Sequence, residues 1–344
     1  MPAEFEAHAA TWLSWPHKEA SWPGILDRIP PLWVEMVRAL IAGEDVHILV
    51  NPAAPATEVE NRLLAAGVGL QRVRLHEVPT NDAWIRDSGP TFITRGRRAQ
   101  AETAIVDWDY NAWGGKYPPF DDDDRIPQRI AAILNMPRFV PGMVLEGGSI
   151  EVNGCGTLLT TEACLLNPNR NPQLTRAEIE TRLRQYLGVR HILWLGDGIS
   201  GDDTDGHVDD LARFVAPNTV VTVLEEDRGD ENYLPLRENY RRLQAMTDQD
   251  GRPLRIVTLP MPRAIVREGM RLPASYANFY VANAVVLVPT FQQPSDAVAL
   301  GVLQELFPQR RVVGIPAVDF VWGLGACHCA TQQQPAADSH GDER

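Results

Sequence analysis

Two segments of this chain carry side chains that could perform covalent chemistry. The first, residues 323–333, contains Cys329, and the second, residues 202–210, contains His207 and Asp209. A thiol can attack an electrophilic carbon, an imidazole can move protons, and carboxylates can hold a positive charge. Together these groups suit chemistry on a cation, and a guanidinium group is the obvious candidate.

The cysteine segment has competing interpretations. A free cysteine is most often a buried structural residue, and Cys327, His328 and Cys329 place metal-ligand types in a row. Structural zinc sites usually space their cysteines by two or more residues and need a second pair elsewhere, which this sequence lacks. The flanking glycines would allow close backbone approach, and residues 331–333 could fix a loop by hydrogen bonding. We therefore interpret Cys329 as a nucleophile.

The histidine segment could instead bind calcium or form a capped turn. If Gly206 takes the sixth position of an EF-hand loop, Gly201 stands first and Ala212 last, where acidic residues are required. We therefore expect His207 and Asp209 at the mouth of a strand, on the same side, because side chains alternate along a strand. The capped turn remains the structural alternative.

Two further segments contain carboxylates that fit the same chemistry. Asp87 follows Trp84 and Arg86, for which an ion pair and a core tryptophan are the ordinary interpretation. Glu146 ends an apolar stretch before two glycines, where it could be a cap or a placed catalytic carboxylate. Neither segment is decisive alone. The aspartate run 121–124 indicates an exposed loop.

Strand-like and helix-like patterns alternate along nearly the whole chain. The predicted strands are residues 46–50, 70–78, 144–152, 157–161, 191–195, 211–215, 220–224, 255–259, 279–288 (a pair) and 312–315. The predicted helices are residues 57–66, 126–134, 175–187, 234–245 and 295–306. Groups of strand, strand, helix and strand recur at roughly 60-residue intervals, which suggests a radial or solenoid array rather than one open sheet. The pattern alone predicts an α/β fold and leaves that choice open.

Composition limits the function classes. The 344 residues are 44% hydrophobic and 22% charged, with four cysteines, which indicates a globular protein of a reducing compartment. A net charge of −13 argues against nucleic acid, because an acidic surface repels phosphates. No apolar run approaches the roughly 20 residues that span a bilayer, and residues 1–8 lack the features of a secretory signal. We expect a cytoplasmic protein with one catalytic domain over 1–335 and a polar, disordered tail over 336–344.

Jointly, these segments resemble the agmatine deiminase family, which is related to bacterial peptidylarginine deiminase. The resemblance covers almost the whole chain and includes WLSWPH at 12–17, NAWGG at 111–115, CLLNPNRNP at 164–172 and HCATQQ at 328–333. It implies the pentein fold, an α/β-propeller of five strand–strand–helix–strand units around a pseudo-fivefold axis, with the site at the centre. This chain departs from the family at GLGAC, residues 323–327, and has Asp205 and Asp210 where asparagine is frequent.

The resemblance also implies roles for individual residues. Cys329 matches the nucleophile and His207 the general acid and base. Glu146 matches the carboxylate that assists the substrate nitrogen and proton traffic, and Asp87 and Asp209 match the pair that grips the guanidinium group.

Trp84 would line the substrate pocket. The implied reaction hydrolyses agmatine to N-carbamoylputrescine and ammonia through a thiouronium ester on the cysteine. It needs no metal and no organic cofactor. The expected partner is a small cationic guanidino compound. A monomer and a homo-oligomer are both compatible with the sequence.

Other functions would use the same residues. Deimination of peptidylarginine or free arginine shares this chemistry and differs only at the far end of the substrate. Free arginine would need a cation for its carboxylate, and the sequence shows no dedicated arginine. An amidinotransferase would need an acceptor amine and exclusion of water. A non-catalytic pentein used for binding should have lost the thiol or the imidazole, and this chain has both.

Overall fold

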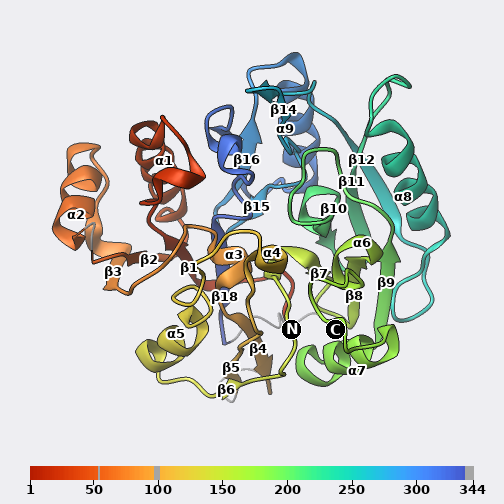
Figure 1. Cartoon of the computed structure of the whole chain (residues 1–344), viewed down its shortest axis with the longest axis horizontal. Coiled ribbons are helices and arrows are strands. Elements are labelled where there is room, and N and C mark those ends of the chain that lie inside the picture. Colours follow the sequence, from red (N-terminus) through yellow and green to blue (C-terminus); the bar gives the residue numbers. More distant parts are fainter. Residues whose placement is uncertain (53–54, 97–100, 338–344) are drawn as a thin grey trace.

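The protein has a mixed α/β fold built from several small sheets. The computed structural model describes residues 1–52, 55–96 and 101–337. In this part of the chain, five sheets have three or four strands each, and one short hairpin forms a sixth, two-stranded sheet. In Figure 1 the sheet with β1 lies at the left, the sheet with β5 at the bottom and the sheet with β11 at the right, and the short helices α3 and α4 lie between them.

The first sheet joins the beginning and the end of the described chain. Its strands, in spatial order, are β18 (Thr331–Pro335), β1 (His8–Ser14), β2 (Asp45–Val50) and β3 (Val73–Glu77). β1 is antiparallel to β18 and parallel to β2, which is parallel to β3. The helices α1 (Pro30–Leu40) and α2 (Ala56–Ala65) connect the parallel strands. The turn that carries Cys329 is therefore held against the N-terminal part of the protein.

The other four sheets share one connectivity. Two antiparallel strands are followed by a helix that crosses over to a third strand, parallel to the second. The strands are β4 (Thr91–Arg95), β5 (Glu102–Val106) and β6 (Arg138–Phe139); β7 (Ile150–Val152), β8 (Thr157–Thr161) and β9 (His191–Leu195); β10 (Ala212–Ala216), β11 (Thr219–Leu224) and β12 (Arg255–Pro260); and β15 (Tyr280–Val281), β16 (Val285–Thr290) and β17 (Arg311–Pro316). The crossover helices are α5 (Ile126–Leu134), α7 (Arg176–Leu187), α8 (Tyr233–Ala245) and α9 (Pro294–Leu306).

Shorter elements lie between these units. The helices are α3 (Ile85–Ser88), α4 (Ala112–Gly115) and α6 (Glu162–Leu165), and the hairpin pairs β13 (Val266–Arg267) with β14 (Met270–Arg271). Turns of 3₁₀ helix occur at Glu19–Ser21, Leu26–Arg28, Leu70–Arg72, Gly147–Ser149, Val208–Asp210 and Phe320–Gly323. None of the helices described is long and apolar enough to cross a membrane.

Local sequence explains where helix α7 begins and ends. The Thr175 side chain accepts from the backbone of Glu178, whose carboxylate accepts from the backbone of Thr175, and this capping box satisfies amides that the first turn leaves free. Ile179 and Leu183 are buried on one face. Gly188 ends the helix in the left-handed region, with φ of 69°.

Most predicted elements are confirmed within one residue at each end, among them strands 157–161 and 191–195 and helix 126–134. Three strand predictions are wrong in part. Residues 70–72 form a 3₁₀ turn before β3, and the predicted pair 279–288 runs instead from 280 to 290. The predicted strand 144–152 is a strand only at 150–152, because its two glycines join a 3₁₀ turn.

Aromatic side chains in edge-on and tilted contact support the wall of the site. The indole of Trp22 packs against Trp33 and Trp84, with ring centroids 5.8 and 5.1 Å away. Its Nε1 donates to the carbonyl of Phe320 over 2.9 Å. These contacts join the loop after β1 to the segment before Cys329.

Candidate active site

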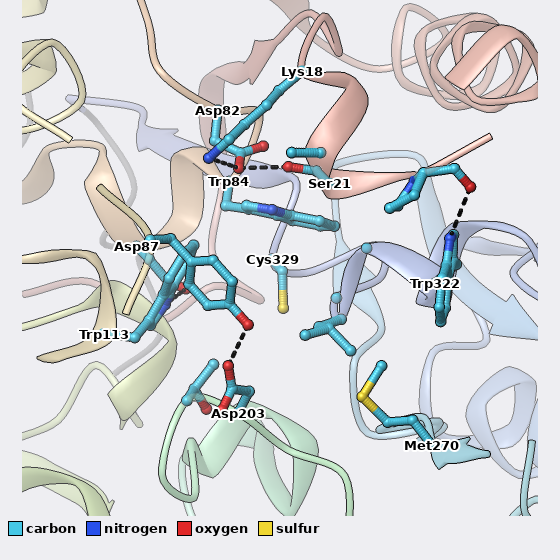
Figure 2. A pocket seen from close by; sticks show the side chains of 17 residues that line it. Lys18, Ser21, Asp82, Trp84, Asp87, Trp113, Asp203, Met270, Trp322 and Cys329 are labelled. Atoms are coloured by element: carbon cyan, nitrogen blue, oxygen red, sulfur yellow. Dashed lines mark hydrogen bonds and ion pairs between the residues drawn. The ribbon is translucent and has the colours of Figure 1, made fainter. Parts of the chain in front are cut away.

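Cys329 lies in the turn before β18 at a cavity of about 220 Å³. Figure 2 shows its sulfur pointing into the space between Trp84, Trp113 and Asp203. A side chain at Gly325 would come within 2.6 Å of Trp84 and 3.0 Å of the Cys329 Cβ. Only glycine therefore lets this segment pass so close to the thiol.

The surroundings of the sulfur are acidic. Burial raises the pKa of Cys329 well above its usual value, and the negative charges of Asp209, Asp210 and Asp87 raise it further. The sulfur lies 3.7 Å from Asp209 Oδ2. Asn278 Nδ2 donates to it over 3.1 Å. The acidic groups oppose a thiolate, so a positive charge or hydrogen-bond donor is needed to favour it.

Asp87 lines the same cavity and is fixed by two donors. Its Oδ2 accepts from Trp113 Nε1 and its Oδ1 from the backbone N–H of Gly148, each over 2.9 Å. Burial raises the pKa of Asp87; the charge of His207 lowers it, and the charges of Asp209 and Glu146 raise it. A bound cation would favour the charged form, since it offsets the cost of ionising a buried carboxylate.

Asp209 lies behind the sulfur and is paired with His328. Its Oδ2 is 2.6 Å from His328 Nδ1, and His328 Nε2 is 2.8 Å from Glu4 Oε2. Burial alone would raise the pKa of Asp209, but the hydrogen bond and charge of His328 lower it overall. Asp209 Oδ1 has no hydrogen-bond partner among the described residues and is free to accept from a ligand.

His207 is fully buried among three carboxylates. Its Nδ1 lies 3.7 Å from Asp87 and 4.0 Å from Asp209, and its Nε2 lies 3.9 Å from Glu146 Oε2. Burial alone would lower the pKa of His207, but Asp87, the neighbouring Cys164 and Asp209 raise it well above its usual value. These surroundings favour the protonated imidazole, which is the form that can act as an acid.

Glu146 faces His207 from the other side. Arg170 Nε donates to Glu146 Oε1 over 2.6 Å, and both side chains are completely buried. The two glycines after Glu146 allow this packing, because a side chain at Gly148 would lie 2.6 Å from His207 Nδ1 and 2.8 Å from Asp87 Oδ1. The double glycine is thus required by the approach of these groups.

The structure brings all six predicted site residues together in two layers. Cys329, Asp87 and Trp84 line the cavity. His207, Glu146 and Asp209 have no exposed surface and lie behind them. The side chains of His207 and Asp209 lie on the same side of the chain, as expected. The backbone between them is the 3₁₀ turn Val208–Asp210, so the prediction that strand alternation places them there is wrong.

The contacts of His328 and Asp202 bear on the two metal-binding alternatives considered from the sequence. Both ring nitrogens of His328 face carboxylates, which leaves neither for zinc beside Cys327 and Cys329. Asp202 accepts from the backbone amides of Thr204, Gly206 and His207, as the capped-turn alternative requires. Ligand atoms of Glu146, Cys164 and His207 lie within 4.8 Å of one another and could hold an ion. Arg170 already neutralises the charge of Glu146, which disfavours a metal ion at this position. That the reaction needs no metal stays a prediction.

Sequence reasoning missed four residues that position this site: Trp113, His328 as a partner of Asp209, Glu4 and Asn278. Trp113 had a signal in the NAWGG motif, and it adopts φ of 55°, a left-handed conformation that a bulky residue rarely takes. His328 was weighed only as a metal ligand. Nothing in the sequence around Glu4 and Asn278 indicates a role.

The aspartate run 121–124 is not simply the exposed loop that we expected. Asp123 is buried and accepts from the backbone N–H groups of Asn81 and Asp82. Asp124 accepts from the backbone of Tyr110. These bonds hold the turn that leads to Trp84.

Comparison with known proteins gives one family. Residues 1–335 match the model of the Porphyromonas-type peptidyl-arginine deiminase. The chain is 39% identical to the agmatine deiminase of Ectopseudomonas mendocina, with 98% of this chain and 95% of that one covered. The agmatine deiminase of Enterococcus faecalis has a similar structure, with a TM-score of 0.91, 35% identity and 98% and 96% coverage. A substrate-bound agmatine deiminase of C. jejuni has a TM-score of 0.86, 31% identity and 97% and 95% coverage.

Proposed function

This chain belongs to the Porphyromonas-type peptidyl-arginine deiminase family, and we propose that it is an agmatine deiminase, a hydrolase that converts agmatine and water into N-carbamoylputrescine and ammonia. The similarity to agmatine deiminases over nearly the full length supports this substrate. The observation that carries the proposal is the meeting of Cys329 and Asp87, which line the cavity, with His207 and Asp209 directly behind them.

The rest of the cavity favours an amine over a carboxylate at the far end of the substrate. Lys18 is the one cationic residue among the described residues that line it, and its Nζ is already 3.2 Å from Asp82 Oδ2. Asp203, with 41% of its side chain exposed, also lines the cavity; it accepts from the hydroxyl of Tyr117 and lies 3.4 Å from Lys116 Nζ. The α-carboxylate of arginine would meet acidic groups here, whereas the second amine of agmatine would be attracted.

The first half-reaction attaches the substrate to the sulfur. A guanidinium group stays protonated because its pKa lies above about 12. Asp87 and Asp209 accept N–H bonds from it and hold its carbon near Cys329. The thiolate forms a carbon–sulfur bond, and the carbon–nitrogen bond to the departing amine breaks as His207 supplies a proton. Ammonia leaves, and a thiouronium ester remains.

The second half-reaction uses water. The neutral His207 takes a proton from the water, whose oxygen attacks the same carbon, and the carbon–sulfur bond breaks. Glu146, 3.9 Å from His207 Nε2, stabilises the imidazolium that forms. The hydroxyl group formed on the carbon releases its remaining proton to solvent, where it protonates the departed ammonia. The product carries a ureido group, and the thiolate is restored. Burial of His207 and Glu146 keeps bulk water from competing for these protons.

We extend the proposal to the organisation of the molecule. The five sheets would surround a pseudo-fivefold axis as a pentein propeller, with β18, β1, α1 and β2 as the unit closed by the two chain ends. Residues 1–335 would form a single catalytic domain. A reducing, cytoplasmic location would suit the four free cysteines among the described residues.

Three substrates distinguish agmatine deimination from its rivals. Purified protein is incubated with agmatine, free arginine or an arginine peptide blocked at both ends, and ammonia release is measured. We expect kcat/KM for agmatine to exceed that for arginine by at least about 100-fold, because placing the α-carboxylate of arginine beside like charges costs several kcal/mol. Acid-quenched samples should show the substrate-derived mass on the peptide containing Cys329. Preferred turnover of the arginine peptide, or an adduct on another cysteine, would contradict the proposal.

A further inference from the structure

Asn278 directly contacts the sulfur that the proposed mechanism uses. The residue is 1% exposed and lies two residues before β15. Its Nδ2 donates to Cys329 Sγ over 3.1 Å and to Asp210 Oδ1 over 3.0 Å. A backbone hydrogen bond from Ala326 also lowers the pKa of Cys329, and Asn278 supplies the side-chain donor among the hydrogen bonds of the described residues.

The orientation of the Asn278 amide follows from its four partners. Its Oδ1 accepts from the backbone N–H of His328 over 3.0 Å and from that of Cys329 over 3.4 Å. A flipped amide would turn its NH₂ group toward two donors and its oxygen toward Asp210 and the sulfur. The donor therefore faces the sulfur before any substrate binds.

On the basis of the proposed function, we propose that Asn278 is a catalytic residue that stabilises the thiolate of Cys329 through its Nδ2–H donor. A hydrogen bond to an ionised acceptor is stronger than one to a neutral acceptor, so this contact favours the anion over the thiol. The same bond fixes the direction of the sulfur, and attack on a planar carbon requires that direction to be defined.

The charges around the sulfur make such a donor necessary. Burial and the carboxylates Asp209, Asp210 and Asp87 disfavour the thiolate. Burial also raises the pKa of Asp210 well above its usual value, and its Oδ1 accepts from the same Asn278 amide over 3.0 Å. His328 points its ring nitrogens at Asp209 and Glu4, away from the sulfur. A cationic side chain at this position would pair with the neighbouring carboxylates instead of the sulfur. The neutral amide of Asn278 donates to the sulfur without forming such an ion pair.

The test measures the thiol without any substrate. Asn278→Asp keeps the acceptor oxygen and replaces the donor by a second oxygen. Alkylation of Cys329 by iodoacetamide is followed across pH by mass spectrometry, in a Cys155→Ser background because Cys155 is exposed. The matched control is Asn239→Asp. Asn239 is also 1% exposed and also uses both ends of its amide, with Gly196 and Asp197.

We expect Asn278→Asp to slow alkylation at neutral pH about tenfold or more and to move its pH profile upward, since one hydrogen bond to a charged group is lost. Asn278→Ala, which adds no acidic oxygen, should give a smaller shift in the same direction and decides the matter if the aspartate variant does not fold. Unchanged profiles in both variants, or an equal shift in Asn239→Asp, would overturn the proposal. The alkylation assay contains no agmatine, so it tests the thiol independently of the substrate. If the pH profile shifts as expected but the unsubstituted protein does not convert agmatine, only the substrate assignment is rejected.

Discussion

Two cysteines only two residues apart have different surroundings. Cys329 borders the cavity, whereas Cys327 is completely buried in the apolar core and burial raises the pKa of its thiol strongly. We predict that Cys329→Ser lowers ammonia release by about three orders of magnitude or more, as loss of a nucleophile does in other enzymes. Cys327→Ser should keep most of it. The opposite order, measured on folded protein, would reject Cys329 as the nucleophile.

The hydrogen bond from Trp113 to Asp87 affects how activity depends on pH. Burial raises the pKa of Asp87, and the indole donor lowers it, so Trp113→Phe should raise it further. Fewer Asp87 carboxylates are then charged at acid pH, and kcat/KM for agmatine at pH 5 should fall about tenfold more than at pH 8.

The control for this prediction is Trp108→Phe. Trp108 is also buried, and its Nε1 has no hydrogen-bond partner among the described residues. Its pH profile should match that of the unchanged protein. An equal acid shift in both variants would mean that loss of indole volume, rather than of the hydrogen bond, causes the effect.

At this scale the sequence predicts the groups that we propose for the chemistry and misses those that orient them. Cys329, His207 and Glu146 belong to residue types whose chemistry is specific. Asn278 reaches the sulfur across 51 positions of sequence, and Glu4 meets His328 across 324. Such pairings arise from tertiary packing, and a single sequence contains no local sign of them.

At the scale of elements, a buried ion network joins the N-terminal turn to the site. Glu4 lies 3.1 Å from Arg86 Nη2, 2.7 Å from Arg213 Nη2 and 2.8 Å from His328 Nε2. Arg213 also pairs with Glu151 over 2.7 Å. Through these contacts Glu4 holds together α3, strand β10 and the turn that carries Cys329.

We predict that Glu4→Gln lowers the free energy of unfolding by about 3 kcal/mol at pH 7, because two buried guanidinium groups lose their shared carboxylate. Burial alone would raise the pKa of Glu4, but Arg213, His328 and Arg86 lower it well below its usual value. A lowered folded pKa gives stability that is present above the unfolded pKa of about 4.3 and lost as the pH falls through the folded pKa. The difference between the two proteins should therefore shrink below about pH 4.

Urea titrations at several pH values would measure this difference. Glu58→Gln is the matched control, since Glu58 pairs with Arg62 over 2.9 Å on an exposed helix face. It should change the unfolding free energy by less than about 0.5 kcal/mol. A Glu4 variant as stable as this control would show that the network contributes nothing net.

Helices and strands with a regular spacing of apolar residues were predictable from the sequence. Turns whose backbone path is fixed by side chains on other elements were not. Helix 126–134 follows from regular spacing of apolar residues. The 3₁₀ turn Gly147–Ser149 interrupts an apolar stretch that resembles a strand, because Gly148 must pass between His207 and Asp87. The requirement comes from side chains on other elements, so the sequence of the stretch itself does not reveal it.

At the scale of the whole molecule, the net charge of −13 affects how fast a cationic substrate arrives. Agmatine carries two positive charges, so kcat/KM should fall several-fold as ionic strength rises from about 0.01 M to about 0.5 M, where the Debye length drops from about 30 Å to below 8 Å. The value of kcat should stay constant, since it refers to bound substrate. A salt-independent kcat/KM would show that arrival is not electrostatically assisted.

The boundary of the folded unit can be tested by shortening the chain. Ala336 still donates its backbone N–H to Ala7 over 2.9 Å, and residues 338–344 of the predicted tail lie outside the described residues. A protein that stops after Ala337 should keep its activity and melting temperature. One that stops after Ala330 lacks β18 and leaves an edge of β1 unpaired, so it should not fold. Equal stability of the two would argue against closure of the first sheet by β18.

The pairing of β18 with β1 also has a consequence for protein synthesis. During synthesis, Asp87, Glu146, His207 and Asp209 are made long before Cys329, and β18 follows that cysteine. A nascent polypeptide that has not reached residue 329 lacks both the proposed nucleophile and the strand that pairs with β1. Turnover at the proposed cysteine therefore begins only after β18 has been made and has docked against β1.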